Sequence, residues 1–336
     1  MRRKNLTIKI PFINLNSMKK IIVSISILII LVVINACDQG KKEGDGGGHS
    51  NLTNAKDTLS YILGSINAKT IVGSGAQAFD NLDKKQIISG FNANLSNYSA
   101  DDCLITLKNL FGENYQDFNK KYVKEGSLCM GKMTGYAFYY DIFKLGGVDL
   151  INLKMVKAGF ADGLYKKDSF LRDDQMRTIM QNFMITLNVR NGNKMLAKAK
   201  LIKGAQIFDN GVVIETIKEG KGPFPGLTDD VKVHYILTSA IGDTIQNSYK
   251  MPNEENKIEP IPLSLNGGVI PGWTFAIPKM KVGGTYRLYL PWDLSYGEQQ
   301  GRESLCFVVE LIARGKAGSF TAVKENKSGE KNNLKL

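Results

Sequence analysis

The sequence has few of the side chains that bind metal ions. Its 336 residues include two histidines and four cysteines, and no two cysteines form a Cys-x-x-Cys pair. Zinc sites collect several such ligands at short spacings, so we expect no metal site. Motifs for a nucleophilic hydrolase, a phosphate-binding loop or paired catalytic carboxylates are also missing, and nothing indicates a cofactor.

The cysteines are too few for a disulfide framework. Apart from Cys37 near the N-terminus there are three, and an odd number does not pair completely. A bridge between Cys103 and Cys129 is one interpretation in an oxidising compartment. Buried free thiols, with Cys306 among them, are the other.

The net charge of +12 raises the question of a nucleic acid or an anionic membrane as partner. Six basic residues lie in the first 36 positions, which contain no acid, and without them the net charge falls to +6. Further lysines lie in the last twenty residues. We therefore interpret the excess charge as solvated ends of the chain and expect no nucleic-acid partner.

The N-terminus has the pattern of a secretory signal peptide. Lys19 and Lys20 precede an uncharged apolar run over residues 21–34, and small residues follow it. A basic segment, a short apolar segment and small residues before a cleavage site define such a signal, here residues 1–36. The run is shorter than the ~20 residues of a spanning helix. Met18, directly before the lysines, is typical of the true start of the signal.

The end of this signal resembles a bacterial lipobox. Residues 34–37 read Ile-Asn-Ala-Cys. The resemblance implies cleavage before Cys37 and acylation of that residue, and two or three acyl chains anchor a protein stably to a membrane. It therefore implies a lipoprotein of the cell envelope, anchored to a membrane through Cys37 and facing the periplasm or the cell surface.

The rest of the chain divides into four segments by composition. Residues 37–56 are rich in Gly, Lys and Asp and predict a flexible tether. Residues 57–200 contain none of the nine prolines and place apolar residues at helical spacing, which predicts an all-α domain. Residues 201–315 are rich in glycine, proline and β-branched residues and predict a second domain. Residues 316–336 are a basic tail that we predict to be disordered.

The helical region has the form of a tandem repeat. Gly90-Phe91 in the first half corresponds to Gly159-Phe160 in the second, and each pair is followed by a leucine and then by two aspartates. The first copy begins with residues 57–64 and the second with residues 133–138. The order and spacing of these elements indicate the repeat more strongly than the identity of their residues does.

The second domain has the pattern of an antiparallel sheet. Residues 231–237, 285–290 and 305–312 have the alternation or the β-branched content of strands. Pro271 opens a short helix, since proline is tolerated in the first turn, and Pro278 ends it. The predicted fold class is α+β, with an all-α arm followed by an antiparallel sheet and one short helix.

Four motifs in this domain resemble, in order, the signature of the FKBP-type peptidyl-prolyl cis-trans isomerases. They read Asp-Val-Lys-Val-His-Tyr at 230–235, Gly-Gly-Val-Ile-Pro-Gly-Trp at 267–273, Met-Lys-Val-Gly-Gly at 280–284 and Leu-Ser-Tyr-Gly-Glu at 294–298. The resemblance covers residues 205–315 and implies a twisted sheet wrapped around the short helix. The helical repeats resemble, more faintly, the dimerisation segment of Mip-like FKBP lipoproteins.

The resemblance implies rotation about X-Pro bonds in proline-containing polypeptides. The barrier is ~18–20 kcal/mol, and no covalent bond breaks, so the site has to bind the twisted amide better than the planar one. By motif, Trp273 forms the floor of an apolar pocket, and the Ile270 N–H and the Tyr296 hydroxyl hold substrate carbonyls. The other substrate-binding positions are Tyr235, Ile245, Gln246, Ile261, Val269 and Phe307.

Several of these positions depart from the family pattern. Ile245 and Ile261 stand where the family has aromatic residues, and Gln246 stands where it has an acid. The loop between Tyr296 and Phe307 is short and lacks an Ile-Pro-Pro stretch. We therefore predict a weak isomerase that assists the folding of exported proteins. The alternative is a non-catalytic chaperone or peptide-binding lipoprotein built on a degenerate FKBP fold.

The resemblance to Mip-like proteins also bears on assembly. Such relatives pair two helical segments from two chains, whereas this chain carries two copies. We predict pairing within the chain, which gives a monomer with a pseudo-twofold helical arm. A homodimer is the alternative.

Overall fold

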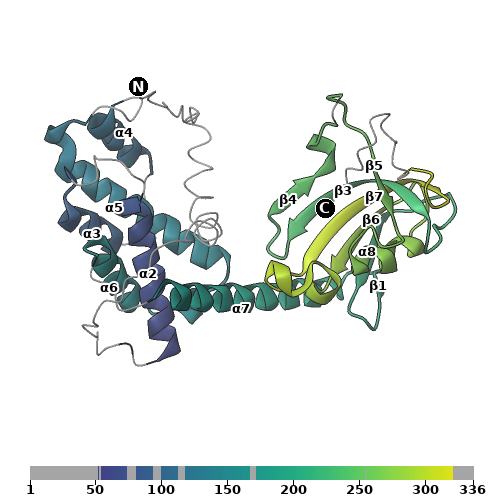
Figure 1. Cartoon of the computed structure of the whole chain (residues 1–336), viewed down its shortest axis with the longest axis horizontal. Coiled ribbons are helices and arrows are strands. Elements are labelled where there is room, and N and C mark those ends of the chain that lie inside the picture. Colours follow the sequence, from purple (N-terminus) through teal and green to yellow (C-terminus); the bar gives the residue numbers. More distant parts are fainter. Residues whose placement is uncertain are drawn as a thin grey trace, which may run out of the picture. The chain divides into compact units, whose positions relative to one another are not determined.

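The structure, a computed structural model, describes residues 52, 54–73, 81–93, 100–112, 118–166, 172–253 and 255–320. The predicted signal peptide, Cys37, most of the predicted tether and most of the basic tail lie outside these residues. No helix in the described part of the chain is long and apolar enough to cross a membrane. The chain forms two compact units that divide between Gln181 and Asn182 (Figure 1).

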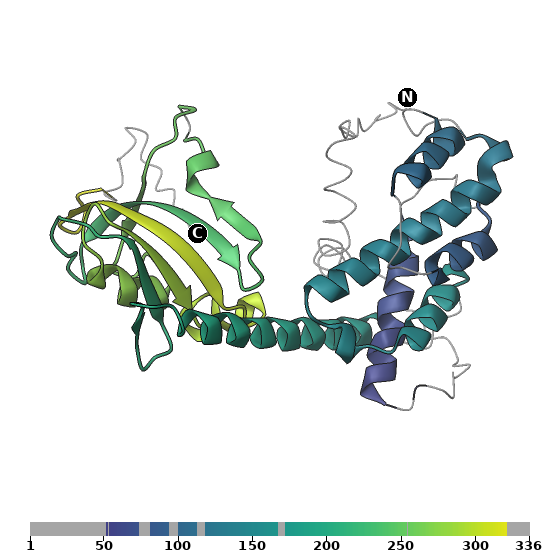
Figure 2. The ribbon, with the colours of Figure 1, turned by 180° about the vertical axis from the view of Figure 1, so that it is seen from behind.

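The first unit is helical, as the absence of proline predicts. Its helices are α2 (Ala55–Gly73), α3 (Lys84–Asn92), α4 (Ala100–Phe111), α5 (Val123–Lys144), α6 (Leu153–Leu164) and the start of α7 (Asp173–Ala199). Helix α2 packs against α6, α3 packs against α5, and α4 lies on α5, as Figures 1 and 2 show. From Asn182 onwards, α7 belongs to the second unit.

Within each helix pair, the two helices approach each other closely because glycines of one helix face the backbone of the other. A Cβ atom at Gly64 of α2 would collide with the carbonyl oxygen of Val156 in α6, and one at Gly131 of α5 would collide with that of Ile87 in α3. Gly159 and Gly90 fill the reciprocal positions, against the carbonyls of Tyr61 and Leu128 respectively. Small residues at a crossing let helix backbones come near each other, so these four positions fix the geometry of both pairs.

Each of the two pairs also has an equivalent hydrogen bond from a helix N-terminus to a serine of the partner helix. The backbone N–H of Asn152, the N-cap of α6, donates to Ser60 Oγ at 2.7 Å, and the N–H of Asp83, the N-cap of α3, donates to Ser127 Oγ at 3.0 Å. Both serines are fully buried. Each side-chain cap also accepts hydrogen bonds from the first turn of its own helix, which satisfies donors that the helix leaves open.

Between the pairs, the rings of Phe91 and Phe160 stack with centroids 3.7 Å apart and planes 3° from parallel. Both side chains are buried. A disulfide joins Cys103 of α4 to Cys129 of α5. Of the two interpretations that the sequence left open for these cysteines, the structure has the bridge, and Cys306 is a buried free thiol.

The second unit contains a seven-stranded sheet and one short helix, α8 (Pro271–Ala276). The strands are β1 (Gln206–Ile207), β2 (Val213–Lys218), β3 (Asp230–Ser239), β4 (Thr244–Asn247), β5 (Ile261–Ser264), β6 (Thr285–Leu290) and β7 (Leu305–Gly315). The order is β1-β2-β6-β7-β3-β4, with β5 also paired to β3, and all pairs are antiparallel. The sheet curves around α8 (Figures 1 and 2), and the predicted fold class is confirmed.

The core of this unit lies between α8 and the inner face of the sheet. Trp273, Ala276 and Ile277 pack there with alternating residues of the strands. In β6 every second side chain is buried, as its sequence pattern predicts. The chain beyond β7 turns back, and the N–H of Phe320 donates to Asp230 Oδ2 at 3.0 Å. The first residues of the predicted tail therefore contact β3.

Candidate functional site

Three aromatic side chains meet where α8 faces the sheet. The ring of Trp273 lies 5.4 Å from that of Tyr235 and 5.2 Å from that of Phe307, edge-to-face in both cases. Tyr235 and Phe307 are 6.2 Å apart. Edge-to-face contacts are a favourable arrangement of aromatic rings. The structure thus brings together three of the residues that the sequence places in the pocket.

The sheet register explains why the two strand residues meet. Leu237 of β3 is opposite Phe307 of β7, and Tyr235 is opposite Val309. Tyr235 and Phe307 are therefore diagonal neighbours on one face, within the reach of aromatic rings. This is the face that α8 covers, and it places both rings beside Trp273.

Trp273 is almost entirely buried, with 3% of its surface exposed. Within the described residues its indole Nε1–H is buried and has no hydrogen-bond acceptor. An unpaired buried donor costs about 1–3 kcal/mol. The residue at the predicted floor is therefore part of the hydrophobic core, and it also carries an unused polar group.

Helix α8 leaves a backbone donor open next to these rings. Ile270 is its N-cap residue, and its carbonyl accepts from the N–H groups of Trp273 and Thr274. Among the described residues, the N–H of Ile270 itself has no protein acceptor. The first N–H groups of a helix have no partner inside it, which leaves this one available to a ligand carbonyl. The side chains of Val269 and Ile270 pack on the rim of the same core.

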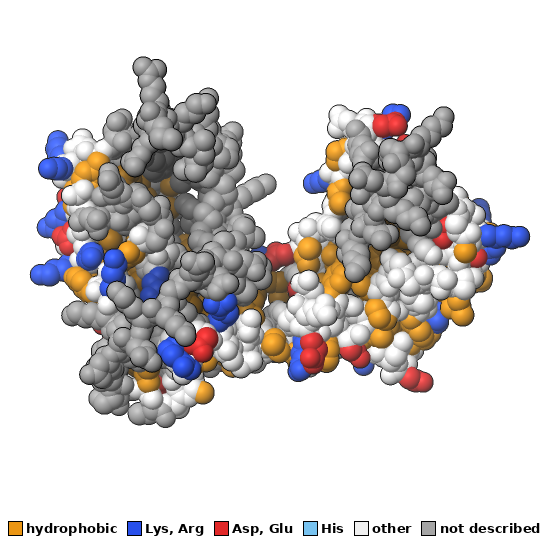
Figure 3. All heavy atoms as spheres, viewed as in Figure 1, with side chains coloured by type: hydrophobic (Ala, Val, Ile, Leu, Met, Phe, Trp, Pro, Cys, Tyr) orange, Lys and Arg blue, Asp and Glu red, His pale blue; other side chains and the backbone are white. Residues whose placement is uncertain are grey.

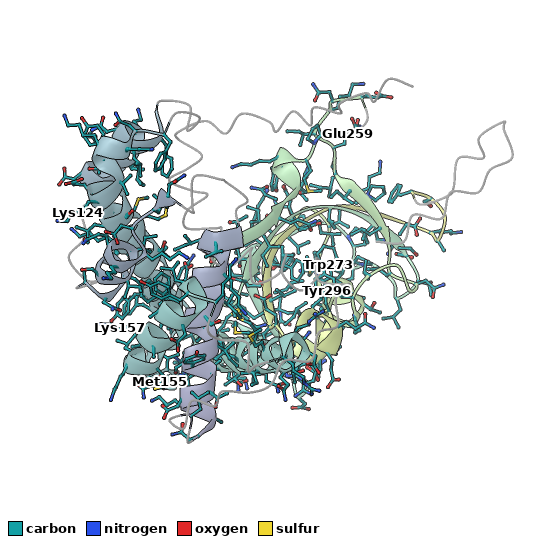
Figure 4. All side chains as sticks on the ribbon, turned by 60° about the vertical axis from the view of Figure 1, so that its left-hand side comes forward. Lys124, Met155, Lys157, Glu259, Trp273 and Tyr296 are labelled. Atoms are coloured by element: carbon teal, nitrogen blue, oxygen red, sulfur yellow. A yellow bond between two sulfur atoms is a disulfide. The ribbon has the colours of Figure 1, made fainter. Side chains whose placement is uncertain are left out.

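The hydroxyl of Tyr296 is a second candidate donor. It lies in the chain between β6 and β7, 48% exposed, and Figure 4 shows it with Trp273 inside the curve of the sheet. Burial raises the pKa of Tyr296. Burial, and then the nearby Tyr296, raise the pKa of Tyr235. Both phenols therefore keep their protons at neutral pH and remain able to donate hydrogen bonds.

Gln246 occupies the place where the resembled family has an acid, and its side-chain oxygen accepts a hydrogen bond. The hydroxyl of Tyr235 donates to Gln246 Oε1 at 2.7 Å. Gln246 is paired with Leu237 in the β3–β4 ladder and so lies on the face of Tyr235. The amide orients the phenol but brings no negative charge to the site.

The two remaining predicted positions lie at the edge of this cluster. Ile261 is opposite Val233 in the β3–β5 ladder, which places it on the same face as Tyr235, one pair further along. Ile245 is next to a register shift in β4 and is 51% exposed. Neither has a ring, so neither adds an aromatic contact to the three described above.

A short loop, residues 297–304, joins Tyr296 to β7; we call it the rim loop. It contains one 3-10 turn (Gly297–Gln300), followed by Gly301 in the left-handed conformation with φ of 69°. Glu298 and Arg302 form an ion pair across the turn at 2.6 Å. Near its end, burial and then Asp243 raise the pKa of Glu303.

Sequence reasoning missed two contributors to this region. The departure from an acid at Gln246 indicates only a lost charge, so the sequence gives no sign of the hydrogen bond that Tyr235 donates to it. The contacts of α7 with the rim loop carry no sequence signal at all, since Asn188 and Gly301 are 113 positions apart.

Comparison with known proteins agrees with this geometry. Residues 222–312 match the family described as FKBP-type peptidyl-prolyl cis-trans isomerase. The C-terminal domain belongs to this family. The matched stretch includes every residue that the sequence predicts for the isomerase site, and the four sequence motifs that resemble the FKBP signature lie within it.

Alignments with individual relatives are longer than the stretch that matches the family. The chain is 30% identical to the FkpA isomerase of Aeromonas hydrophila over 50% of its own length and 66% of that protein. It is 28% identical to the Mip isomerase of Coxiella burnetii, over 56% of this chain and 84% of that one. The outer membrane protein MIP of Legionella longbeachae is 28% identical over 52% and 80%. Of the solved structures, FkpA from Escherichia coli aligns over 58% of this chain and 97% of its own, with 26% identity and a TM-score of 0.38.

Proposed function

We propose that the FKBP domain catalyses the cis-trans isomerisation of X-Pro bonds in exported polypeptides, at low rates. The observation that carries this proposal is the pair of open donors beside the aromatic cluster. The Ile270 N–H has no acceptor within the described chain, and the Tyr296 phenol keeps its proton. An apolar surface flanked by two donors suits a proline ring and the carbonyls on either side of it.

The proposed mechanism is differential binding. When the X-Pro amide twists, it loses its resonance, and its carbonyl oxygen carries less negative charge. Water solvates the planar amide better than the twisted one, so an apolar surface favours the twisted form. The rings of Tyr235, Trp273 and Phe307 provide that surface. Donors at Ile270 and Tyr296 fix the neighbouring carbonyls, and only interactions that are stronger in the twisted state accelerate the reaction.

Three features support the low rate. Gln246 is neutral, so no carboxylate stabilises the partial positive charge of a twisted carbonyl carbon. Ile245 is half exposed and cannot form an aromatic wall. The rim loop has eight residues between Tyr296 and β7, which leaves little chain to close over a substrate.

Two tyrosines allow a matched test. Tyr296→Phe removes the proposed donor. The control is Tyr249→Phe: Tyr249 lies just after strand β4, and its hydroxyl donates to Glu310 at 2.6 Å. We expect isomerisation of a prolyl tetrapeptide by the full chain to fall about tenfold in the first variant and to be unchanged in the second. Equal rates in both would refute the role of Tyr296. No catalysis by the native chain, together with suppression of aggregation, would instead favour a chaperone.

We also propose that the protein is a lipoprotein of the cell envelope, anchored through Cys37. The support is the lipobox-like sequence and the signal pattern before it. One relative carries the name outer membrane protein. Expression of the native gene and of Cys37→Ser in a bacterial host with labelled palmitate tests this. We expect label in the first protein alone, and label in both would contradict the assignment.

For the helical unit we propose two copies of one motif, paired within the chain. The support is the reciprocity of its contacts: Gly64 with α6 corresponds to Gly131 with α3, and Ser60 corresponds to Ser127. The start of the second copy, which corresponds to residues 57–64, then shifts from residues 133–138 to residues 124–131. The stacked pair Phe91 and Phe160 lies where a twofold axis would pass between equal residues.

Mass measurement in solution tests the pairing. Light scattering of the chain without its signal peptide should give the mass of one chain at micromolar concentration. A stable dimer that persists on dilution would overturn intrachain pairing and favour the homodimer.

A further inference from the structure

We propose that the C-terminal part of α7 is a brace for the rim loop, in which Asn188 and Gly192 act as positioning residues for the Tyr296 hydroxyl. The inference rests on the proposed isomerase function for its meaning, but its contacts all lie within the second unit. Neither residue lies in the stretch that matches the FKBP family, because that match begins at residue 222.

The first contact is a hydrogen bond across the two segments. Asn188 Nδ2 donates to the carbonyl oxygen of Gly301 at 3.0 Å, in a partly buried position. Gly301 has the left-handed backbone, and a Cβ atom there would lie 3.3 Å from the same Asn188 nitrogen. The hydrogen bond therefore holds the left-handed residue at which the rim loop turns toward β7.

The second contact is steric. A Cβ atom at Gly192 would collide with the side chain of Ser304, whose exposed surface is only 1%. Glycine in the middle of a helix costs about 1 kcal/mol relative to alanine. Its presence at this point of α7 is explained by the close approach of the loop, because no larger residue fits.

Both contacts come from one face of the helix. Asn188 and Gly192 are four residues apart, and residues at that spacing are neighbours on a helical surface. The buried residues Leu187 and Asn191 form the adjacent row with the same spacing. The face is therefore continuous over more than one turn, and it meets the loop at its centre, Gly301, and at its end, Ser304.

The position of the loop links this brace to the site. Its first residue follows Tyr296, and Leu305 after its last residue begins β7, which carries Phe307. The loop also has the Glu298–Arg302 ion pair, with the side chains 70% and 41% exposed, and the Arg302 guanidinium lies 5.2 Å from the centre of the Trp292 ring. Exposed pairs contribute little. The α7 contacts therefore add buried restraints to the loop that follows the second donor.

The experiment compares three variants of the full chain. Asn188→Ala removes the donor, Gly192→Ala introduces the collision, and Asn193→Ala changes an exposed asparagine on the same helix as the control. Hydrogen exchange of the rim-loop amides is measured by mass spectrometry. We expect exchange about fivefold faster in Asn188→Ala, as for one lost hydrogen bond, faster still in Gly192→Ala, and unchanged in the control.

A compensating change and the kinetics complete the test. Adding Ser304→Gly to Gly192→Ala removes the colliding side chain, so the double variant should return toward native exchange. In prolyl-peptide assays Asn188→Ala should raise KM about fivefold with kcat retained. Rim-loop exchange equal to the control in both single variants would overturn the brace. If the native chain shows no isomerase activity, the proposed function fails, while the exchange data still decide the brace.

Discussion

The two units of this protein are stabilised by different kinds of packing. The helical unit depends on residues that are small: Gly64, Gly90, Gly131 and Gly159 let backbones touch. The FKBP domain depends on large ones, with Trp273 and Phe307 filling the space between α8 and the sheet. Close backbone contact tolerates no added atom, whereas an aromatic core with partly exposed edges can accept some change. The first unit should therefore be the more sensitive to small substitutions.

The strongest way to break this contrast is a single side chain in α3. Gly90→Val places two methyl groups against the backbone of α5 and should cost the helical unit about 3 kcal/mol or more. Ser89→Val puts the same side chain on the exposed face beside it and is the control. Thermal unfolding followed by circular dichroism should show early melting in Gly90→Val alone. Equal melting of the two variants would contradict close packing at the α3–α5 crossing.

Removal of the disulfide should have the next largest effect on the stability of the helical unit. The bridge between Cys103 and Cys129 closes a loop across 26 positions, and such a link contributes about 2–3 kcal/mol. Cys103→Ser with Cys129→Ser should lower the unfolding temperature of the helical unit and leave that of the FKBP domain unchanged.

Burial raises the pKa of Cys306 to about 11, so Cys306 should resist alkylation at pH 8 until the domain unfolds. Rapid alkylation of folded protein would contradict this.

A change in the FKBP domain should sharpen the contrast by altering activity without altering the fold. Gln246→Glu keeps an acceptor for the Tyr235 hydroxyl and restores a charge near the site. We expect the isomerisation rate to rise by up to about tenfold, equivalent to 1.4 kcal/mol, with little change in unfolding temperature. A lower rate would show that the neutral amide is itself required.

The smallest effect concerns Glu303, whose pKa is raised by burial and by Asp243. A carboxyl with a raised folded pKa binds its proton more tightly in the folded state. The domain should therefore lose stability as pH rises from the ordinary value of 4.5 through the folded pKa. The loss is below about 1 kcal/mol, since the group is partly exposed. Glu303→Gln should remove this dependence, measured as unfolding temperature from pH 4 to 7, and Glu259→Gln on an exposed turn should not.

The FKBP domain was largely predictable from its sequence because its motifs mark positions with a fixed chemical task. Pro271 starts α8, alternation in residues 285–290 gives β6, and Trp273 meets Tyr235 and Phe307 as the motifs imply. The helical unit was predictable only in its class. Gly90 and Gly159 mark corresponding points of the repeat in the sequence, but no motif pairs Gly64 with Gly131, so the sequence places the start of the second copy at residues 133–138.

The supporting contacts of the site could not be derived from the chain. Asn188 meets Gly301, and Asp243 faces Glu303, only because the fold brings distant segments together. A sequence pattern reports local periodicity and known motifs, and it contains neither kind of information about these pairs. The disulfide likewise remained one of two interpretations until α4 was placed on α5.

The central claim is that the FKBP domain is a weak isomerase, because its site lacks the acid, two aromatic residues and the long loop of the family pattern. The direct test is a refolding reaction limited by proline isomerisation, with the full chain and an FKBP relative that retains the acid, the aromatic walls and the long loop at equal concentration. We predict acceleration by this protein above the uncatalysed rate, at least about tenfold weaker than by the relative, and reduced further by Tyr296→Phe. A rate equal to that of the relative, or no acceleration at all, would contradict the account.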